Sequence, residues 1–318
     1  MQKVHFPYRS SSHLSFLHVV AESGAWEKHG LEVEYNFPIS AKEAHKAVAE
    51  GSIEFVGGNH VSTYAKRTRG DKWVYLAQTV NTLNHRLVVR PDSGIERVAD
   101  LKGKIIGSYG SHPGLNDWLF LRQNGLDEDR GDVKFKRKVE GKLDPEAGEL
   151  DSETPLDLVR GGKVDAYFMT PPADLFAKRA GLRVIEIDAL PMIWFTTLSS
   201  GLPFVETHPD IVEKFLKGVI EGIAYFKTRR LESIKIIQAK YKEEGDLDNE
   251  AAAYLYDELA NILEPKLYPS LEAIHNVYLE AMRQDPDAKK VNPMALWDLH
   301  HLRRIDDSGF IDALYRGN

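Results

Sequence analysis

The chain has 318 residues, of which 42% are hydrophobic and 28% are charged, the ordinary usage of a globular protein. Lysine and arginine number 41 against 48 aspartates and glutamates, so the net charge is −7. Because the chain has no basic excess to hold a nucleic-acid backbone, we expect no nucleic-acid partner. The chain has no cysteine, which excludes disulfides, a thiolate nucleophile and cysteine-ligated zinc or iron–sulfur clusters.

The sequence carries no sign of membrane insertion or of a targeting segment. No apolar run approaches the ~20 residues that a membrane-spanning helix needs. The first nine residues lack the apolar stretch and the small-residue cleavage site of a signal peptide. We therefore predict a cytoplasmic protein, or a periplasmic one if an N-terminal leader has been removed.

Strands and helices alternate in the first part of the chain. Short apolar runs predict strands at residues 3–8, 31–37, 53–57, 73–78 and 86–90. Amphipathic stretches predict helices at residues 14–22, 41–50 and 61–69. Gly24, Gly51 and Gly70 follow these helices as stop signals. Such alternation implies βαβ units and hence a parallel-rich sheet.

A second set of strands and helices follows, and the chain then becomes helical. The predicted strands are at residues 105–108, 133–139, 164–168, 182–187 and 193–199, and the helices between them are at 115–123, 155–160 and 173–179. The acidic stretch 140–153 is expected to be a surface loop, and the last strand is expected to return to the first lobe. After Pro209, helices are predicted at residues 211–227, 231–241, 250–263, 270–283 and 294–302.

This pattern predicts an α/β protein with two lobes and a cleft between them. We expect the first lobe at residues 1–88 and the second at residues 89–192. Residues 193–318 are expected to return to the first lobe and to form the C-terminal helices.

Polar and titratable residues follow several of the predicted strands. Ligands of open α/β sheets bind beyond the carboxyl ends of the strands, so we expect these residues to converge on one cleft. Arg9 is suited to hold a carboxylate or sulfonate through two hydrogen bonds. The serines after it precede a helix, which directs hydroxyls and N–H groups to the same point. The predicted substrate-binding residues are Arg9, Ser10, Ser11, Ser12, Asn59, Gln78, Ser111, Thr170 and Trp194.

Histidines at the same strand ends are the candidate catalytic residues. An imidazole has a pKa near physiological pH, which suits it to move a proton. We predict that His60 moves a proton, with His13 or His112 as its partner, and that Arg9, His60 and His112 meet around one small acid. The alternative is that a histidine in a loop is solvated or structural. We expect His45 to have such a role and not a role in the site.

The sequence contains no motif for a cofactor or a metal. The phosphate-binding loop, the dinucleotide-binding glycine pattern and the Gly-x-Ser-x-Gly turn are all absent. The histidines lack the close helical spacing of a zinc site. We therefore predict no metal and no cofactor, and we expect the partner to be a small anionic organic ligand.

Several segments resemble a known family of binding proteins. Residues 21–33, Ala-Glu-Ser-Gly-Ala-Trp-Glu-Lys-His-Gly-Leu-Glu-Val, are similar to the start of nitrate/sulfonate/taurine-type solute-binding proteins. Residues 87–95 and 99–107 resemble their first crossover and second-lobe entry, and residues 162–167 their strand leading back to the cleft. The resemblance spans residues 3–230. It implies a two-lobed type II periplasmic-binding-protein fold with a helical C-terminal region, a fold that hosts both carriers and enzymes.

Two enzyme groups on that fold share details with this chain. The thiamine-pyrimidine synthase group has a histidine followed by a helix, as in His60 and residues 65–70, but it also has a cysteine-rich motif that this chain lacks. Aromatic sulfinate desulfinases share the turn after the first strand and a Gly-Gly pair at the third. Their catalytic cysteine falls near Ser11 or Ser12, and their arginine before the pair falls at Val56. Dihydroxyphthalate decarboxylases also use this fold, but no motif assigns the chain to them.

These observations leave two main hypotheses for function. The favoured one is a cytoplasmic enzyme on a solute-binding scaffold that acts on a small, aromatic or heteroaromatic, anionic substrate. Its chemistry resembles that of a decarboxylase or desulfinase, a lyase or hydrolase with a histidine acid or base. The alternative is the substrate-binding protein of an ABC importer for sulfonates, pyrimidines or related organic acids, with a membrane permease as partner. A cytoplasmic ligand sensor is a weaker third possibility.

Overall fold

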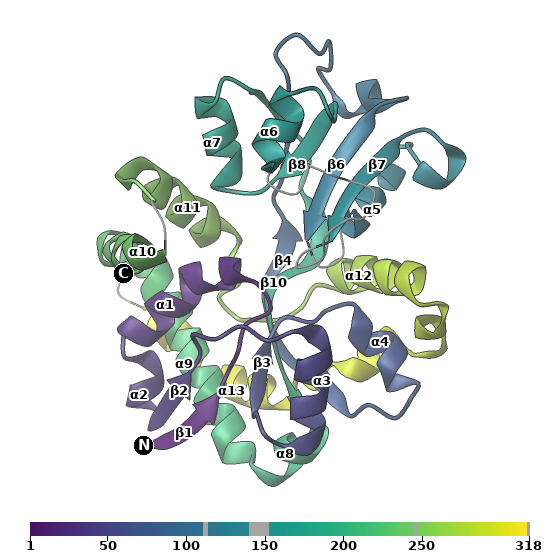
Figure 1. The fold of residues 1–318 in the computed structure, drawn as a ribbon. Helices are drawn as coiled ribbons and strands as arrows, with labels where there is room; N and C mark the ends of the chain where they lie inside the picture. The colour runs from purple at the N-terminus through teal and green to yellow at the C-terminus, as the bar shows by residue number, and fades with distance from the viewer. Residues whose placement is uncertain (111–113, 140–152, 245–246, 317–318) are drawn as a thin grey trace. The chain divides into compact units, whose positions relative to one another are not determined.

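The computed structural model describes residues 1–110, 114–139, 153–244 and 247–316 (Figure 1). The chain forms two compact units. The first contains Met1–Leu83 and Pro191–Asn318, and the second contains Asn84–Leu190. Within the described residues, no helix combines the length and the apolar character that crossing a membrane requires. Of the predicted loop at residues 140–153, all but the last residue lies outside the described part of the chain.

Two small sheets form the centre of the first unit. Strand β1 (Gln2–His5) pairs in parallel with β2 (Leu31–Glu34). The second sheet has the order β3–β10–β4, with β3 at Phe55–Gly57, β10 at Leu190–Gly201 and β4 at Trp73–Leu83. Strand β10 runs antiparallel to β3, with Leu198 opposite Gly57. A late strand of the chain is therefore paired with an early one.

The early helices of the first unit begin and end where local signals place them. Helix α1 (Leu14–Glu22) is followed by α2 (Ala25–Lys28), and α4 covers Ser62–Arg67. Helix α3 (Ala41–Glu50) starts at a capping box, because the Ser40 side chain accepts from the Glu43 N–H and the Glu43 side chain accepts from the Ser40 N–H. It ends at Gly51, whose φ of 68° suits glycine. The predictions for α1 and α3 are confirmed.

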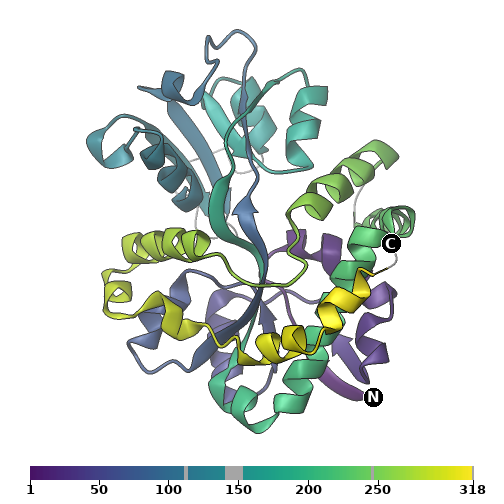
Figure 2. The same cartoon turned by 180° about the vertical axis from the view of Figure 1, so that it is seen from behind.

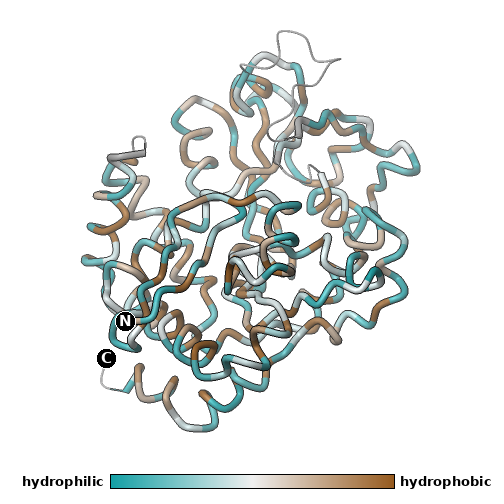
Figure 3. Tube along the Cα trace, turned by 60° about the horizontal axis from the view of Figure 1, so that its bottom comes forward, coloured by the Kyte–Doolittle hydropathy of each residue, from teal (hydrophilic) through white to brown (hydrophobic). Residues whose placement is uncertain are grey.

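The C-terminal helices belong to the first unit. They are α8 (Leu202–Thr207), α9 (Pro209–Thr228), α10 (Arg230–Glu244), α11 (Asn249–Ile262), α12 (Leu271–Gln284), α13 (His300–Asp307) and α14 (Phe310–Leu314). Figure 2 shows α13 and α14 running along α9, which they contact. Hydrophobic and hydrophilic residues alternate along the helical segments, as the brown and teal of Figure 3 show.

The predicted helix at 294–302 is wrong. A 3₁₀ turn covers Pro293–Leu296, and the backbone is then extended at Trp297 before α13 begins at His300. The extended stretch forms a parallel β-bridge between Trp297 and Tyr75 of β4, and the Asp298 N–H donates to the Tyr75 carbonyl at 2.8 Å. Pairing with β4 therefore interrupts a pattern that reads as helical when it is considered locally.

The second unit is built on a mixed sheet with the strand order β7–β6–β8–β5–β9. Strand β6 is parallel to β7 and β8, whereas β5 is antiparallel to β8 and β9. The expectation of a parallel-rich sheet is therefore wrong for β5 and β9. The strands are β5 (Arg86–Val89), β6 (Ile105–Gly110), β7 (Lys134–Val139), β8 (Ala166–Met169) and β9 (Arg183–Glu186), and the helices are α5 (Leu115–Gln123), α6 (Pro155–Arg160) and α7 (Ala173–Arg179).

Two glycines allow α9 to pack closely against the N-terminal helices. A Cβ atom on Gly218 would lie 2.2 Å from Cδ1 of Trp26, and one on Gly222 would lie 2.7 Å from Cγ1 of Val20. On the same helix, Phe215 stacks on Phe55 of β3 with ring centroids 3.8 Å apart. Helix α9 therefore joins the β3 sheet to α1 and α2 in one core.

Replacing Gly222 by alanine should destabilise the first unit. Alanine is favoured over glycine inside a helix by about 1 kcal/mol. The overlap with Val20 should outweigh that gain and lower the free energy of unfolding by roughly 1–3 kcal/mol in urea denaturation. The control K214A changes an exposed residue of α9 and should alter stability by less than about 0.5 kcal/mol. A G222A variant as stable as K214A would contradict this account of the packing.

Candidate functional site

The loops after β1 and β3 lie against each other in the first unit. The Gly57 N–H donates to the Pro7 carbonyl at 2.9 Å, and the Arg9 N–H donates to the Gly57 carbonyl at 3.1 Å. A Cβ atom on Gly58 would lie 3.0 Å from Cβ of Arg9 and 3.1 Å from Cε1 of His13. Gly58 also has a φ of 102°, a conformation that side chains disfavour. Glycine at this position therefore permits Arg9 and His13 to approach the end of β3.

Arg9, His13 and His60 form a cluster beside Gly58. Arg9 is half-buried, and its NH1 donates to the carbonyl of Ile39. His13 is 4% exposed, and its Nδ1 has no hydrogen-bond partner among the described residues. Burial is the main reason that the pKa of His13 is lowered to about 3, and the nearby His60 and Arg9 act in the same direction. His13 is therefore a neutral ring whose Nδ1 has no hydrogen-bond partner among the described residues, and it lies within reach of the positive charge of Arg9.

The three serines between Arg9 and His13 are exposed. Ser10 occupies the N-cap position of a 3₁₀ turn at Ser11–His13, but its side chain makes no capping hydrogen bond. Its hydroxyl instead lies 3.0 Å from the hydroxyl of Ser12. These hydroxyls are therefore not committed to capping the helix that follows.

A chain of buried hydrogen bonds holds the ring of His60. The Nε2 group of Gln78 donates to the Trp194 carbonyl at 2.7 Å and also to the Val80 carbonyl. The Thr197 hydroxyl donates to Oε1 of Gln78 at 2.6 Å, and Nδ1 of His60 lies 2.6 Å from the same hydroxyl oxygen. Gln78 and Thr197 are fully buried. Gln78 thus contributes to the site through Thr197 and His60.

Two non-glycine residues of this region have left-handed backbone conformations. Asn59 has a φ of 73°, and Phe195 has a φ of 63°. The Phe195 ring packs 5.3 Å from that of His13, while the half-buried Trp194 packs against the core of the first unit. Backbone conformations of this kind persist where the surroundings fix them, and they occur often at functional sites.

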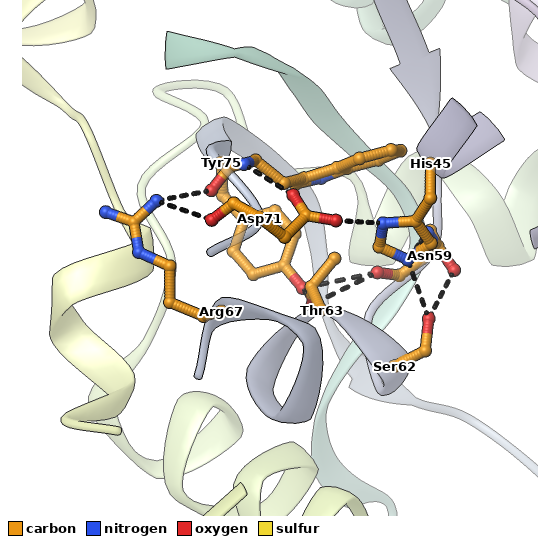
Figure 4. A network of polar contacts seen from close by, with 8 residues as sticks. His45, Asn59, Ser62, Thr63, Arg67, Asp71 and Tyr75 are labelled. Atoms are coloured by element: carbon orange, nitrogen blue, oxygen red, sulfur yellow. Dashed lines mark hydrogen bonds and ion pairs between the residues drawn. The ribbon is translucent and has the colours of Figure 1, made fainter. Parts of the chain in front are cut away.

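A second polar network holds the side chain of Asn59 (Figure 4). Asp71 lies 2.6 Å from Nδ1 of His45, so that ring nitrogen is the donor. Nε2 of His45 then accepts from the Asn59 amide at 3.0 Å, and the Ser62 hydroxyl donates to Oδ1 of Asn59 at 3.0 Å. Burial favours a higher pKa for Asp71, but the hydrogen bond from His45 holds that pKa below its usual value.

The order Asp71, His45, Ser62 resembles a charge-relay triad, but its hydrogens are placed differently. Ser62 Oγ lies 3.1 Å from Nε2 of His45. The Ser62 hydroxyl, however, donates its hydrogen to Oδ1 of Asn59. The Asn59 amide donates to Nε2 of His45, so the lone pair of that nitrogen is already used. The serine therefore has no base to activate it. We conclude that the network positions Asn59.

Tyr75 holds the backbone next to Asn59. Its hydroxyl donates to the carbonyls of Asn59 and His60, at 3.2 and 3.1 Å, and also contacts the hydroxyl of Thr63. Burial raises the pKa of Tyr75 well above its usual value, so the hydroxyl keeps its proton. His60 is thus fixed by its backbone through Tyr75 and by its ring through Thr197.

The remaining predicted site residues belong to the second unit or to the undescribed part of the chain. Thr170 follows β8 in the second unit, and its carbonyl accepts from the N–H of Ala173 at 2.9 Å. Ser111 and His112 lie outside the described residues. Within the second unit, the Ser108 hydroxyl donates to Asp117 at 2.9 Å, and burial raises the pKa of Asp117 to about 6.

Sequence reasoning missed Thr197, Tyr75 and Asp71. Thr197 left a usable signal, because it is a polar residue inside a strand with a buried apolar half, as Gln78 is in β4. A buried polar side chain needs a hydrogen-bond partner, and two such residues on neighbouring strands are candidates for each other. Asp71 is separated from His45 by strand β3 and helix α4, and no local pattern links the two residues. Among the described residues, no group of three or more histidine, aspartate or glutamate side chains is placed to hold a metal ion.

Two α/β units, the first made from both ends of the chain, define the class of this protein. It has the type II periplasmic-binding-protein fold, as the sequence resemblance predicted. The family described as NMT1/THI5 like matches residues 12–133. No curated protein has a sequence that matches this chain.

Solved structures with this fold include binding proteins and an enzyme. The periplasmic aliphatic sulphonate binding protein SsuA of Escherichia coli is 16% identical, with a TM-score of 0.66 over 93% of this chain and 99% of that one. The alkanesulfonate-binding protein SsuA of Xanthomonas axonopodis pv. citri, bound to MOPS, is 15% identical with a TM-score of 0.61 over 92% and 96%. A mutant of the desulfurization enzyme DszB in complex with biphenyl-2-sulfinic acid is 15% identical with a TM-score of 0.62 over 97% and 100%.

The neutral, buried His13 should make stability depend on pH. The pKa of His13 is about 3 in the folded chain against 6.5 for a free histidine, so below pH 6.5 the unfolded chain binds a proton that the folded chain does not. The free energy of unfolding should therefore fall as the pH drops from 6.5 toward 3, by up to about 1.4 kcal/mol per pH unit from this group. In H13N the fall should be shallower, as measured by urea unfolding between about pH 7 and about pH 4.

The matched control for this measurement is H275N, which replaces an exposed histidine on α12. It reports the effect of losing an imidazole that the fold does not bury. An H13N variant that keeps the pH dependence of the wild type, or one that changes it no more than H275N does, would contradict the assignment.

Proposed function

We propose that this chain binds a small organic anion, a sulfonate or carboxylate, in the first unit at Arg9, His13 and His60. The observation that carries the proposal is the cluster at Gly58, where a half-buried arginine lies beside a buried imidazole with an unused nitrogen. A buried polar atom without a partner is unfavourable, and a ligand that supplies the partner relieves this cost.

The chemistry of the cluster favours an anion over a cation or a neutral molecule. A guanidinium group presents a fixed fork of donors that matches the oxygens of carboxylates and sulfonates. The Ile39 carbonyl takes one of these donors and holds the group in place. Among the relatives in structure, one SsuA is bound to MOPS, which is a sulfonate, and the DszB mutant is bound to a sulfinic acid. Both ligands belong to the class that Arg9 is suited to hold.

We propose that the protein acts as a carrier, which captures the ligand and delivers it to a membrane permease. The SsuA structures support this role, because one is a periplasmic aliphatic sulphonate binding protein and the other an alkanesulfonate-binding protein bound to MOPS. A carrier of this kind works in the periplasm, and fractionation of the native cells tests that location directly. Recovery of the protein in the cytoplasmic fraction would favour the enzyme hypothesis described next.

The second candidate is an enzyme that moves a proton with His60. The observation that favours it is the double anchoring of His60 through Thr197 and Tyr75, since a general acid or base must be held in position. The absence of cysteine excludes a thiolate mechanism for such an enzyme. Loss of a carboxylate from a ring, by contrast, requires protonation of the carbon, for which a histidine is suited.

Replacing Arg9 should weaken anion binding more than replacing an exposed charged residue does. We expect wild-type protein to bind at least one of ethanesulfonate, benzenesulfonate and benzoate in isothermal titration calorimetry. R9A should weaken that binding roughly 10- to 100-fold, because it removes a charge-assisted hydrogen-bond pair. R9K should restore it in part, since lysine keeps the charge and loses the fork.

The control is R303A, which removes an exposed arginine of α13 and should leave the affinity unchanged. Binding that survives R9A intact would place the anion elsewhere and contradict the proposal. Turnover of the bound acid, followed by NMR of the mixture and abolished in H60Q with affinity kept within about tenfold, would decide for the enzyme over the carrier.

A further inference from the structure

We propose that Glu43 is a positioning residue for Arg9, and that its charge makes the site select organic acids with one negative charge over those with two. This inference rests on the proposed anion site and narrows its ligand class. The expected ligands are monosulfonates and monocarboxylates, and disulfonates and dicarboxylates are disfavoured. Glu43 acts through the peptide group that Arg9 contacts and not by touching the ligand.

The peptide group between Ile39 and Ser40 is hydrogen-bonded on both sides. Its carbonyl oxygen accepts from the Arg9 guanidinium. Its N–H, which belongs to Ser40, donates to Oε2 of Glu43 at 2.9 Å. The oxygen and the hydrogen of a trans peptide, as this one is, point in opposite directions. The guanidinium and the carboxylate are therefore linked through one peptide group that lies between them.

The backbone before this peptide group is tied to the segment that carries Arg9. The Ile39 N–H donates to the Tyr8 carbonyl at 3.0 Å, and the Tyr8 N–H donates to the Phe37 carbonyl at 3.1 Å. These bonds fix the position of the chain but not the rotation of the peptide group that follows. The hydrogen bond to Glu43 fixes that rotation, so that the carbonyl oxygen faces Arg9.

The capping box at the start of α3 holds the Glu43 carboxylate in place. The Ser40 hydroxyl accepts from the Glu43 N–H at 3.2 Å, so the two residues bind each other reciprocally. A hydrogen bond to an ionised acceptor is stronger than a neutral one, and linked hydrogen bonds polarise one another. The Ile39 carbonyl is therefore a better acceptor for Arg9 than an isolated carbonyl. The capping residue has a second role, which is to orient the arginine.

The charges of Arg9 and Glu43 also act on each other. The hydrogen bonds with Ser40 are the main reason that the pKa of Glu43 is lowered, and the charge of Arg9 acts in the same direction. The interaction is mutual, so the carboxylate reduces the positive potential around the guanidinium. One anionic group of a ligand still meets the donors of Arg9, whereas a second negative charge is repelled by Glu43. Because Glu43 is exposed, salt screens this repulsion.

The positioning role is tested by isothermal titration calorimetry with benzenesulfonate. E43Q keeps an oxygen that accepts from the Ser40 N–H, whereas E43A removes both the acceptor and the charge. We expect E43Q to bind at least as tightly as the wild type, and E43A to bind about three- to tenfold more weakly than E43Q. The matched control is D157A, which removes the acidic residue of the capping box at Thr154 in the second unit and should leave the affinity unchanged. Equal affinities of E43A and E43Q would overturn the positioning role.

The selectivity is tested at low ionic strength with benzenesulfonate and benzene-1,3-disulfonate, and with ethanesulfonate and ethane-1,2-disulfonate as the aliphatic pair. The wild type should bind the monosulfonate about tenfold more tightly, and in E43Q this ratio should fall about threefold. In about 300 mM salt the ratios of the two proteins should approach each other. The control E50Q removes an exposed charge at the other end of α3 and should keep the wild-type ratio. A ratio that is unchanged in E43Q, or a wild type that prefers the disulfonate, would overturn the selectivity.

These measurements also separate the inference from the proposed function. If R9A weakens binding while E43A and E43Q behave as the wild type does, the anion site stands and the inference is overturned. If the wild type binds none of the acids, the proposed anion site fails and the inference fails with it. Should E43A not fold, S40A takes its place, because it removes the hydroxyl that holds Glu43. S40A should bind benzenesulfonate more weakly than the wild type, and an unchanged affinity would contradict the positioning role.

Discussion

The proposed site depends on the close approach of two loops at Gly58. The hydrogen bonds that join Pro7, Gly57 and Arg9 bring the segment after β1 against the end of β3. This approach buries His13 between Gly58 and Phe195, and burial is the main reason that its pKa is low. The same contact brings the Arg9 side chain against Gly58 on the same side as His13, and the Arg9 charge lowers the pKa of His13 in the same direction as burial. A side chain larger than glycine at residue 58 would separate the two loops and remove both effects.

Two polar networks then fix the residues that follow Gly58. The network of Asp71, His45 and Ser62 occupies the amide of Asn59, and the network of Gln78 and Thr197 occupies Nδ1 of His60. A buried donor or acceptor that is left without a hydrogen bond costs about 1–3 kcal/mol. Other arrangements of these side chains would leave such groups unpaired, so the networks hold one arrangement. This explains how Asn59 is kept in a left-handed conformation and why His60 has a defined orientation. Rigidity of this kind suits a site that must recognise a small ligand.

The sequence predicts helices better than it predicts the strand pairing and the site. Helices α1 and α3 carry their start and stop signals within a few residues, so local reading finds their ends. Strand β4 was expected to end at Gln78 but runs to Leu83, because the polar residues Thr79 and Asn81 find carbonyl partners far away in the chain. The bridge between Trp297 and Tyr75 likewise depends on a contact that no local pattern encodes.

The residues of the candidate site differ in the same way, because some follow from local patterns and others depend on distant contacts. Rules for α/β sheets led to Arg9, His13 and His60, because all three follow predicted strands. They did not lead to Thr197 or Asp71, whose importance lies in which distant residue they contact. Asn59 and Gln78 were expected to touch the ligand, and the structure shows their amides engaged with His45, Ser62 and Thr197.

The central claim, an anion held by Arg9 beside His13 and His60, is tested most directly by a crystal structure of the protein with benzenesulfonate bound. The account predicts sulfonate oxygens within hydrogen-bond distance of the Arg9 guanidinium, at the Gly58 loop. A well-occupied sulfonate bound elsewhere, with Arg9 making no contact to it, would contradict the account.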